Sequence, residues 1–486
     1  MNLKNTFCSG SLLLLLTAAC YAQTSVSNKS SNQLPTVSIV EHLKSDVPRL
    51  MKQSEVPGMS IAFIRNAKVI TGNYYGVTNA DTKQPVNRQT IFEAASLSKI
   101  VTAYAALKLV DAGKLNLDTP LNKYLGNNYE VAEGDDRINL ITTRRVLSHS
   151  AGFPNWRPGE TGLLPINFTP GAKFSYSGEG FVYLSKVIEK ITNMNFEAYI
   201  QKVVFDPLQM TSSSFSWKDS FKPLKIYRHN FLGEVSFRWE GKGYNAAASL
   251  HTTLEDYSKF VIALLNGTGL KKATWQEMFT PQIKVNETVY PQLAWGLGVG
   301  LEVMPEGTFF WHWGDQGDSK CYVTAQLNTK DAVLFFTNSR NGLSFASEIL
   351  HDVFTGEHPA IDWLDYGKYN PAIKTLYTAI KDKGAVIALK EYADNKKKDE
   401  KQQISESIIN SIGYMLMNQK KLDDAIEVFK QNTVDFPESS NTWDSLAEAY
   451  MNKGNKELAI KYYEKVLALD PSSTNAAEQL KKLKAQ

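Results

Sequence analysis

A serine and a lysine stand three residues apart at the start of a long apolar stretch. Ser96 and Lys99 lie directly before the apolar run 100–113, whose composition predicts a helix. Residues three positions apart share one face of a helix. A serine hydroxyl becomes a nucleophile when a base removes its proton, and burial or another cation lowers the pKa of a lysine enough for that task. Ser96 is therefore a candidate nucleophile and Lys99 its base, with a solvated helix start as the structural alternative.

Two later segments carry further candidate side chains. Tyr176 ends the stretch 171–178, directly before a predicted helix over residues 179–192. The segment 309–314 predicts a strand that closes on a glycine, where a backbone can approach a ligand without a side chain between them. His312 and Gly314 therefore mark a third wall of a possible site.

These three segments, in this order, resemble the Ser-x-x-Lys, Tyr-x-Asn and Lys-Thr-Gly motifs of the serine β-lactamase and penicillin-binding-protein family. The resemblance extends from about residue 36 to 355 and is closest to the branch of class C β-lactamases, D-aminopeptidases and related esterases. It implies an α/β (α+β) fold, with an antiparallel sheet flanked by helices plus an all-helical domain. The segments that carry it, besides the three motifs, are 57–64, 68–72, 91–95, 147–152, 247–250, 294–298 and 334–339.

The resemblance implies acyl transfer through a covalent intermediate. Ser96 would attack a carbonyl while Lys99 and Tyr176 accept and relay its proton, each with a pKa lowered by a nearby positive charge. Tyr176 would then act as the base of deacylation. The backbone N–H groups of Ser96 and Asp315 would form the oxyanion hole. For Tyr176 alone, a packed aromatic ring with its hydroxyl on a loop is the structural alternative.

The chain also departs from the family pattern at two positions. Gly178 stands where the motif Tyr-x-Asn has its asparagine, so the amide that would orient an acylamino group is missing. His312 stands where many members have a lysine, and a neutral imidazole attracts a carboxylate less than an ammonium does. The missing asparagine weakens the case for a β-lactamase, and the histidine weakens the case for substrates that carry a carboxylate. Gly178, His312 and Gly314 remain the predicted substrate-binding residues.

The roles of the two histidines stay open at this point. A histidine between two tryptophans is as often structural as functional, and the period of a strand predicts that Trp311 and Trp313 share one face while His312 points to the other. We interpret His149, in the stretch 148–152, as part of a structural turn. Pro154, Asn155 and Trp156 follow it and are candidates to line the cleft.

Composition excludes several other classes of function. The chain has 486 residues, enough for more than one domain, and 53 basic against 50 acidic residues. This balance gives no reason to expect a nucleic acid or a charged membrane surface as partner. The seven histidines form no metal-binding motif, so we expect neither a metal nor another cofactor.

The N-terminus predicts export. Lys4 gives a basic start, residues 11–19 form an apolar core, and residues 20–22 provide a small-residue cleavage site, which together indicate a secretory signal peptide over 1–22. The stretch 17–20 also resembles a bacterial lipobox, so lipidation at Cys20, as in an outer-membrane lipoprotein, is the alternative to a periplasmic or secreted protein. Only Cys321 otherwise survives processing, so no internal disulfide is available.

A 34-residue period appears near the C-terminus. It relates Gly413 to Ala447, Ala425 to Ala459, Phe429 to Tyr463 and Pro437 to Pro471. This is the period of tetratricopeptide repeats, and residues 475–484 could form their capping helix. Two copies are fewer than such arrays need, so we expect the segment 373–395 to supply further stacking partners. A peptide-binding surface and a structural appendage are both open as the role of the repeats.

The sequence therefore predicts five segments. They are a signal peptide over 1–22, a flexible leader over 23–35, a β-lactamase-like serine hydrolase over 36–358, a helical connector over 359–404 and tetratricopeptide-like repeats over 405–486. The predicted activity is hydrolysis of an ester or of a small amide such as a D-amino-acid peptide. The alternative is a binding protein that uses the same scaffold for a peptide or cell-wall fragment without turnover, with repeats that recruit a protein partner.

Overall fold

The computed structural model describes residues 34–127, 129–157, 162–241 and 243–485. The predicted signal peptide over 1–22, Cys20 and most of the predicted leader lie outside the described residues. Within them, no helix is long and apolar enough to cross a membrane, and no cluster of His, Cys, Asp or Glu side chains is suited to hold a metal ion.

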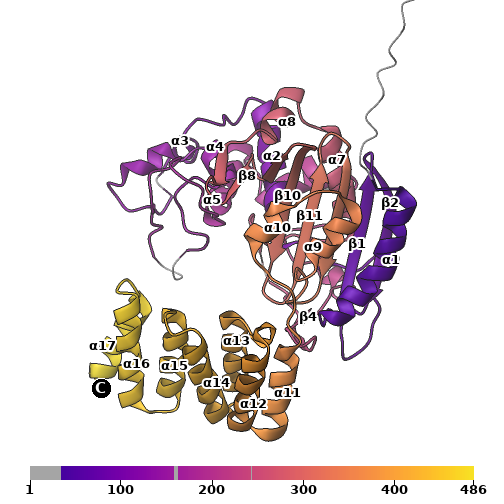
Figure 1. The fold of residues 1–486 in the computed structure, drawn as a ribbon. Helices are drawn as coiled ribbons and strands as arrows, with labels where there is room; N and C mark the ends of the chain where they lie inside the picture. Colours follow the sequence, from indigo (N-terminus) through magenta and orange to yellow (C-terminus); the bar gives the residue numbers. More distant parts are fainter. Residues whose placement is uncertain (1–33, 128, 158–161, 242, 486) are drawn as a thin grey trace, which may run out of the picture.

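An eight-stranded antiparallel sheet forms the centre of the larger part of the molecule (Figure 1). Its order, β2-β1-β12-β11-β10-β9-β8-β7, places the first hairpin of the chain beside the last strand of the sheet, so residues near 60 pair with residues near 335. The strands are β1 (Gly58–Arg65), β2 (Lys68–Gly76), β7 (Ile283–Asn286), β8 (Tyr290–Trp295), β9 (Gly300–Met304), β10 (Gly307–Asp315), β11 (Lys320–Gln326) and β12 (Asp331–Thr337).

Both faces of this sheet are covered, and the alternation of side chains along the strands divides them. On β1, Met59, Ile61 and Phe63 share a core with α1 (Thr36–Gln53) and α9 (Ala346–Val353). Ala62 and Ile64, the residues between and after them, join the core on the opposite face, which contains α2 (Ser98–Asp111) and α7 (Leu254–Asn266). A strand with two covered faces is buried along its whole length, as nearly all residues of β1, β11 and β12 are.

Helix α2 lies between the sheet and a mainly helical region. Eleven of its fourteen residues are buried, as expected of a helix that is covered on all sides. The helical region comprises α3 (Leu121–Leu125), α4 (Thr143–Leu147), α5 (Glu179–Thr192), α6 (Phe196–Ile200) and a π-helical turn over Gln201–Phe205; α8 (Lys272–Met278) follows α7. The chain also forms two short pairs of strands. They are β3 (Phe92–Glu93) with β6 (His251–Thr252), and β4 (Arg228–His229) with β5 (Val235–Phe237).

A third layer of helices follows α10 (Pro359–Leu364). Successive helices pack as pairs in a row below the sheet (Figure 1) and share one hydrophobic core. Gly413 lies so close to Phe429 that a Cβ on it would come within 2.4 Å of the ring. The helices are α11 (Ala372–Lys383), α12 (Ala385–Lys398), α13 (Glu406–Asn418), α14 (Leu422–Asp435), α15 (Ser440–Asn452), α16 (Lys456–Leu469) and α17 (Thr474–Ala485).

The pair α11–α12 is the partner on which the repeats stack. Leu376 and Leu389 from this pair belong to the same core as Ile409 and Leu416 of α13. The helical array therefore begins one helix pair before the segment in which the sequence shows the 34-residue period. Phe231 and Leu232, from the hydrolase part, enter that core as well. At the same junction, an Arg340 nitrogen donates to the Ser411 hydroxyl at 3.1 Å, and Lys374 pairs with Glu55 at 2.8 Å.

The turn between β8 and β9 presses directly against α2. Gly298 adopts a φ of +86°, in the left-handed region, and its N–H donates to the Leu147 carbonyl at 2.9 Å. A Cβ at this position would lie 2.2 Å from the Cβ of Ala103. Only glycine permits both the backbone conformation and the close approach that holds α2 against the sheet.

We expect Gly298→Ala to destabilise the hydrolase part by clearly more than Gly113→Ala. Gly113 has a similar φ of +67°, but nothing lies within 4 Å of the Cβ it would gain, so its substitution reports the backbone cost alone, about 1–2 kcal/mol. The shift of the unfolding midpoint in denaturant measures both variants. Equal shifts would contradict the proposed steric role of Gly298.

Candidate active site

Ser96 lies in a strained turn between β3 and α2. It is the middle residue of a 3₁₀ turn over Ala95–Leu97, and the preceding Ala95 has a φ of +45°, which is uncommon for a residue with a side chain. Ala95 and Leu97 are buried, whereas Ser96 is only half-buried. The neighbouring Ser98 hydroxyl accepts from the Leu250 N–H at 3.0 Å, so it serves the structure. The turn thus leaves Ser96 partly exposed between two buried residues.

Lys99 is the fully buried partner of Ser96. Its Nζ lies 3.1 Å from Ser96 Oγ and donates to the Ala247 carbonyl at 3.0 Å. No carboxylate of the described residues forms an ion pair with this amine. Burial lowers the pKa of Lys99 to about 7, because the charged form loses hydration without a compensating anion. A large fraction of the amine is therefore neutral near pH 7 and able to accept a proton.

Tyr176 lies beside this pair. Lys99 Nζ is 4.7 Å from the centre of the Tyr176 ring, which packs against Trp313 at 4.8 Å. The buried Tyr176 hydroxyl makes no hydrogen bond with the described residues. Burial raises the pKa of Tyr176 well above its usual value, and the nearby Ser96 side chain offsets this only in part. The expectation of a lowered pKa for Tyr176 is wrong, because the aromatic surroundings that orient the ring also exclude the water that would stabilise a phenolate.

His149 holds the loop that carries Tyr176. Its Nδ1 accepts from the Ser177 N–H at 3.0 Å, its carbonyl accepts from the Ser175 N–H at 2.7 Å, and its ring lies 4.2 Å from that of Tyr176. Burial, with Lys99 and His312 nearby, lowers the pKa of His149 well below its usual value, so the ring is neutral. The sequence predicted a structural turn at His149, which agrees with its φ of +53°. The sequence did not predict that the His149 ring contacts Tyr176.

His312 is fully buried on β10. Its Nδ1 lies 2.7 Å from the Trp313 carbonyl, while Nε2 has no partner among the described residues. Burial and the nearby Lys99 lower the pKa of His312 to about 3, so it is neutral. Trp311 belongs to the core on the side of α1, and Trp313 packs on the same core. No ligand contact of His312 is shown, and its substrate-binding role remains a prediction.

Gly314 brings the end of β10 against the turn that carries Ser96. A Cβ on Gly314 would lie 2.3 Å from Cys321 Sγ, 2.8 Å from the Ala94 carbonyl and 2.9 Å from the Cβ of Ala95. This contact places Asp315, the next residue, at the same end of the site as Ser96. The two residues predicted to supply oxyanion-hole N–H groups therefore lie on neighbouring segments.

The Asp315 carboxylate is anchored from three directions. It pairs with Lys320, accepts from the Gly317 N–H at 2.7 Å, and accepts from the Tyr366 hydroxyl at 2.7 Å. Although burial opposes it, Lys320 and these hydrogen bonds hold the pKa of Asp315 below its usual value. Tyr366 lies after α10, beyond the predicted motifs, and nothing in the sequence pattern pointed to it.

Gly178 and Trp156 meet at the other end of the site. The Gly178 N–H donates to the backbone carbonyl and side-chain oxygen of Asn155 at 2.9 and 3.0 Å. The indole of Trp156 is 45% exposed, and Lys99 Nζ lies 5.6 Å from one of its ring centres. Trp156 therefore lies beside the site, as the sequence indicated, and Gly178 is covered by it.

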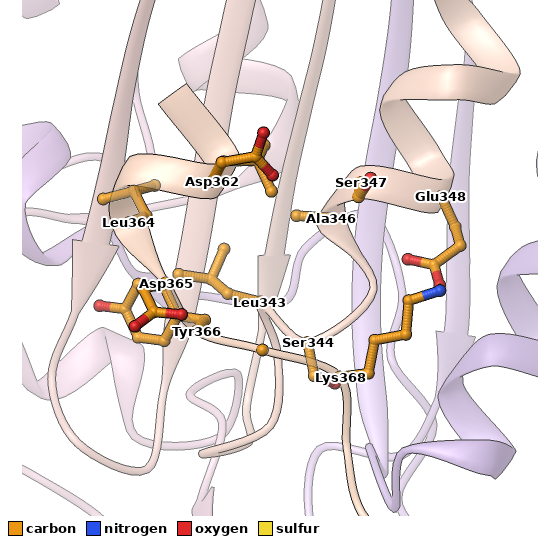
Figure 2. Close-up of a pocket in the computed structure, with 12 residues that line it drawn as sticks. Leu343, Ser344, Ala346, Ser347, Glu348, Asp362, Leu364, Asp365, Tyr366 and Lys368 are labelled. Carbon is orange, nitrogen blue, oxygen red and sulfur yellow. The ribbon is translucent and has the colours of Figure 1, made fainter. Parts of the chain in front are cut away.

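A separate pocket of about 360 Å³ lies between the start of α9 and α10 with the segment that follows it (Figure 2). Leu343, Ser344 and Ala346 line one side, and Leu364 and Tyr366 line the other. Ser96, Lys99 and Tyr176 are not among its lining residues. Tyr366 connects the two regions, since its hydroxyl reaches the Asp315 carboxylate.

The comparisons with known proteins agree with this fold. The family model described as Beta-lactamase matches residues 43–353, well over half of the chain, and this protein belongs to that family. A tetratricopeptide repeat model matches residues 440–473. The molecule is thus a β-lactamase-family domain with a C-terminal helical repeat segment.

Individual relatives are distant. Protein flp of Staphylococcus aureus is 28% identical over 206 residues, or 39% of each chain, so this protein spans about two fifths of that relative's length. A beta-lactamase of Pseudomonas fluorescens is 29% identical over 251 residues, which is 48% of this chain and 66% of the relative.

Two solved structures share the fold. The octameric penicillin-binding protein homologue from Pyrococcus abyssi gives a TM-score of 0.57 at 23% identity, covering 69% of this chain and 81% of that one. The D-alanine carboxypeptidase AmpC from Burkholderia cenocepacia gives 0.55 at 19% identity, covering 66% of this chain and all of that one. At these identities the likeness concerns the fold alone.

The buried amine makes a prediction about stability and pH. The pKa of Lys99 is about 10.4 in the unfolded chain. In the folded protein it is lowered to about 7. Between these values the unfolded state holds one more proton, so this residue makes folding more favourable as pH rises, by at most about 1.4 kcal/mol per pH unit.

We therefore expect the native protein to gain stability relative to Lys99→Met between pH 7 and pH 10, as measured by denaturant unfolding at each pH. Lys123→Met, which alters an exposed lysine on α3, is the control and should show no such trend. A constant difference between the native protein and Lys99→Met across this range would mean that the buried amine is not neutralised near pH 7.

Proposed function

We propose that this protein is a serine hydrolase that forms an acyl-enzyme on Ser96. The observation that carries the proposal is the 3.1 Å contact between Ser96 Oγ and a buried amine whose pKa is lowered to about 7. A base with a pKa close to the working pH is best suited to take up and return a proton. Lys99 fits this role because its surroundings favour the neutral amine.

In the proposed reaction, Ser96 and Lys99 transfer a proton once during acylation and once during deacylation. Ser96 Oγ attacks the carbonyl carbon of the substrate while the neutral Lys99 amine accepts its proton. The leaving alcohol or amine then departs with that proton as the carbonyl re-forms in the acyl-enzyme. In the second half, the neutral Lys99 amine accepts a proton from water as the water oxygen bonds to the acyl carbon. The bond between that carbon and Ser96 Oγ then breaks, the carboxylic acid leaves, and Lys99 returns the proton to Oγ. Because its pKa is raised, Tyr176 takes part as a neutral phenol that passes a proton on, rather than as a phenolate base.

The negative charge that develops on the carbonyl oxygen requires fixed donors. We assign this role to the backbone N–H groups of Ser96 and Asp315. The contact of Gly314 with Ala94 and Ala95 supports the assignment, because it brings the two segments together without an intervening side chain. The anchored Asp315 carboxylate supports it further, because it restrains the backbone of that residue.

The proposed substrates are esters or small amides, D-amino-acid peptides included. His312 is neutral and offers no ammonium to attract a carboxylate, although its unpartnered Nε2 suits a hydrogen bond with a substrate group. Gly178 has no side-chain amide. These two features favour substrates that need neither a carboxylate nor an acylamino group for recognition.

We further propose that the protein is exported through its N-terminal segment 1–22, either periplasmic, secreted, or lipidated at Cys20. The repeat segment has the capacity for protein interaction that its family implies, and its partner is not identified. Cell fractionation of the full chain and of the variant Cys20→Ala, with mass analysis of the mature N-terminus, distinguishes these locations.

We expect a fluorophosphonate to add covalently to the native protein, detected by intact mass, and Ser96→Ala to lose the adduct completely. Ser347→Ala, on α9, is the control and should label normally. A panel of p-nitrophenyl esters, D-alanyl peptides and nitrocefin then identifies the substrate class. The absence of an adduct and of turnover would favour the alternative, a non-catalytic binding protein for a peptide or cell-wall fragment.

The rate of acylation is expected to depend on pH through Lys99. Below pH 7 the amine is protonated and cannot accept the proton of Ser96, so the rate should fall about tenfold per pH unit and level off above pH 7. Rapid-mixing measurements of p-nitrophenol release test this. A flat profile between pH 5 and 8 would exclude Lys99 as the base.

Tyr366→Phe is expected to slow acylation about three- to tenfold by loosening Asp315, with little change in stability. Tyr369→Phe is the matched control, because the Tyr369 hydroxyl on the same segment is buried and makes no hydrogen bond with the described residues. Single-turnover rates for both variants measure the effect. Identical rates would show that the Tyr366–Asp315 contact does not influence the site.

A further inference from the structure

The space above Gly178 is filled by the indole of Trp156. Gly178 has a φ of −78° and a ψ of −37°, which any residue can adopt, so its backbone does not require glycine. A Cβ there would lie 2.6 and 2.7 Å from two carbons of the Trp156 six-membered ring and 2.9 Å from the Asn155 carbonyl. Position 178 therefore requires glycine because its neighbours, chiefly the indole, occupy the volume that a side chain would need.

Polar contacts hold the residues on both sides of Trp156. Before it, the Asn155 carbonyl accepts from the N–H groups of Gly178 and Glu179 at 2.9 and 3.1 Å. After it, the Arg157 N–H donates to Glu179 at 3.3 Å, and the Arg157 guanidinium pairs with Glu130 and Glu179. These contacts tie the backbone on both sides of Trp156 to the start of α5 and to Glu130.

The indole is also both exposed and close to the reacting groups. It is 45% exposed, although Lys99 Nζ lies only 5.6 Å from a ring centre. An exposed tryptophan beside a half-buried nucleophile offers a flat apolar surface to whatever enters the site. A polar amide laid against that surface would lose hydrogen bonds to water, whereas an aromatic ring would gain contact area.

We propose that Trp156 determines substrate specificity by forming an aromatic wall for the acyl group, so that the protein prefers esters and thioesters whose acyl part carries a planar apolar ring. The inference rests on the proposed function, because it concerns the same site. It assigns the acyl side because the acyl group stays attached to Ser96 through both halves of the reaction, next to Lys99 and the indole. The leaving group departs after the first half.

The experiment compares two substrates with the same small leaving group. These are the S-ethyl thioesters of acetic acid and of phenylacetic acid, with release of ethanethiol followed by a thiol reagent. We expect Trp156→Ala to lower the ratio of kcat/KM for phenylacetyl over acetyl by tenfold or more. Trp156→Phe should keep the ratio within threefold of the native value. Trp443→Ala, which removes an indole on α15, is the control and should leave the ratio unchanged.

A second measurement tests the geometry. Gly178→Ala should lower turnover of the acetyl thioester by at least tenfold when Trp156 is present. In the Trp156→Ala background the same substitution should cost about threefold or less, with the Asn155 carbonyl responsible for the remainder. Equal losses in both backgrounds would show that the indole does not occupy this space and would overturn the inference.

The outcomes separate the two proposals. If the native protein hydrolyses neither thioester and takes up no fluorophosphonate, the proposed function fails and the inference with it. If the native protein turns over both thioesters and Trp156→Ala leaves their ratio unchanged, only the inference fails. If Trp156→Ala instead alters selectivity between ethanethiol and thiophenol esters of acetic acid, without altering the acyl ratio, the acyl assignment is wrong.

Discussion

The burial of one amine governs the chemistry of the site. Lys99 has lost its hydration, and among the described residues its nitrogen has two hydrogen-bond partners, the Ser96 hydroxyl and the Ala247 carbonyl, so the neutral form is favoured at ordinary pH. Such burial requires that α2 be covered on all sides, by the sheet on one side and by the helical region on the other. Gly298, which lets the β8–β9 turn reach α2, is one of the contacts that keep this helix covered. Fold and reactivity are therefore linked through the packing of a single helix.

Aromatic rings supply the surroundings in which the amine stays neutral. The rings of His149, Tyr176 and Trp295 lie within 6.0 Å of one another, and His312 packs on the last two. The same low-polarity environment keeps Tyr176 a neutral phenol and both imidazoles uncharged. In the reaction that we propose, protons therefore move between neutral groups, without a permanent ion pair.

The segment after α10 is part of the site's support as well as a link to the repeats. Trp363 packs on Trp311 and Trp313, and the Tyr366 hydroxyl binds the Asp315 carboxylate. Both residues lie beyond position 353, where the family model ends. A few residues further on, α11 begins the helical array and Lys374 contacts Glu55 of the hydrolase part. The two parts of the chain thus meet close to Asp315.

Local spacing in the sequence made Ser96 and Lys99 a candidate pair and predicted the strand with Gly314 and the helical repeats, because each depends on residues a few positions apart or on a regular period. The order of the three motifs along the chain was needed to favour catalysis over a solvated helix start. The 34-residue period likewise identified the buried Gly413, Ala447 and Phe429. The raised pKa of Tyr176, the role of His149 beneath it, and the contacts of Tyr366 and Trp156 were decided only by tertiary structure. These properties arise from burial and from contacts between segments 22 to 51 residues apart or more, and no local pattern encodes which distant ring will exclude water from a given hydroxyl.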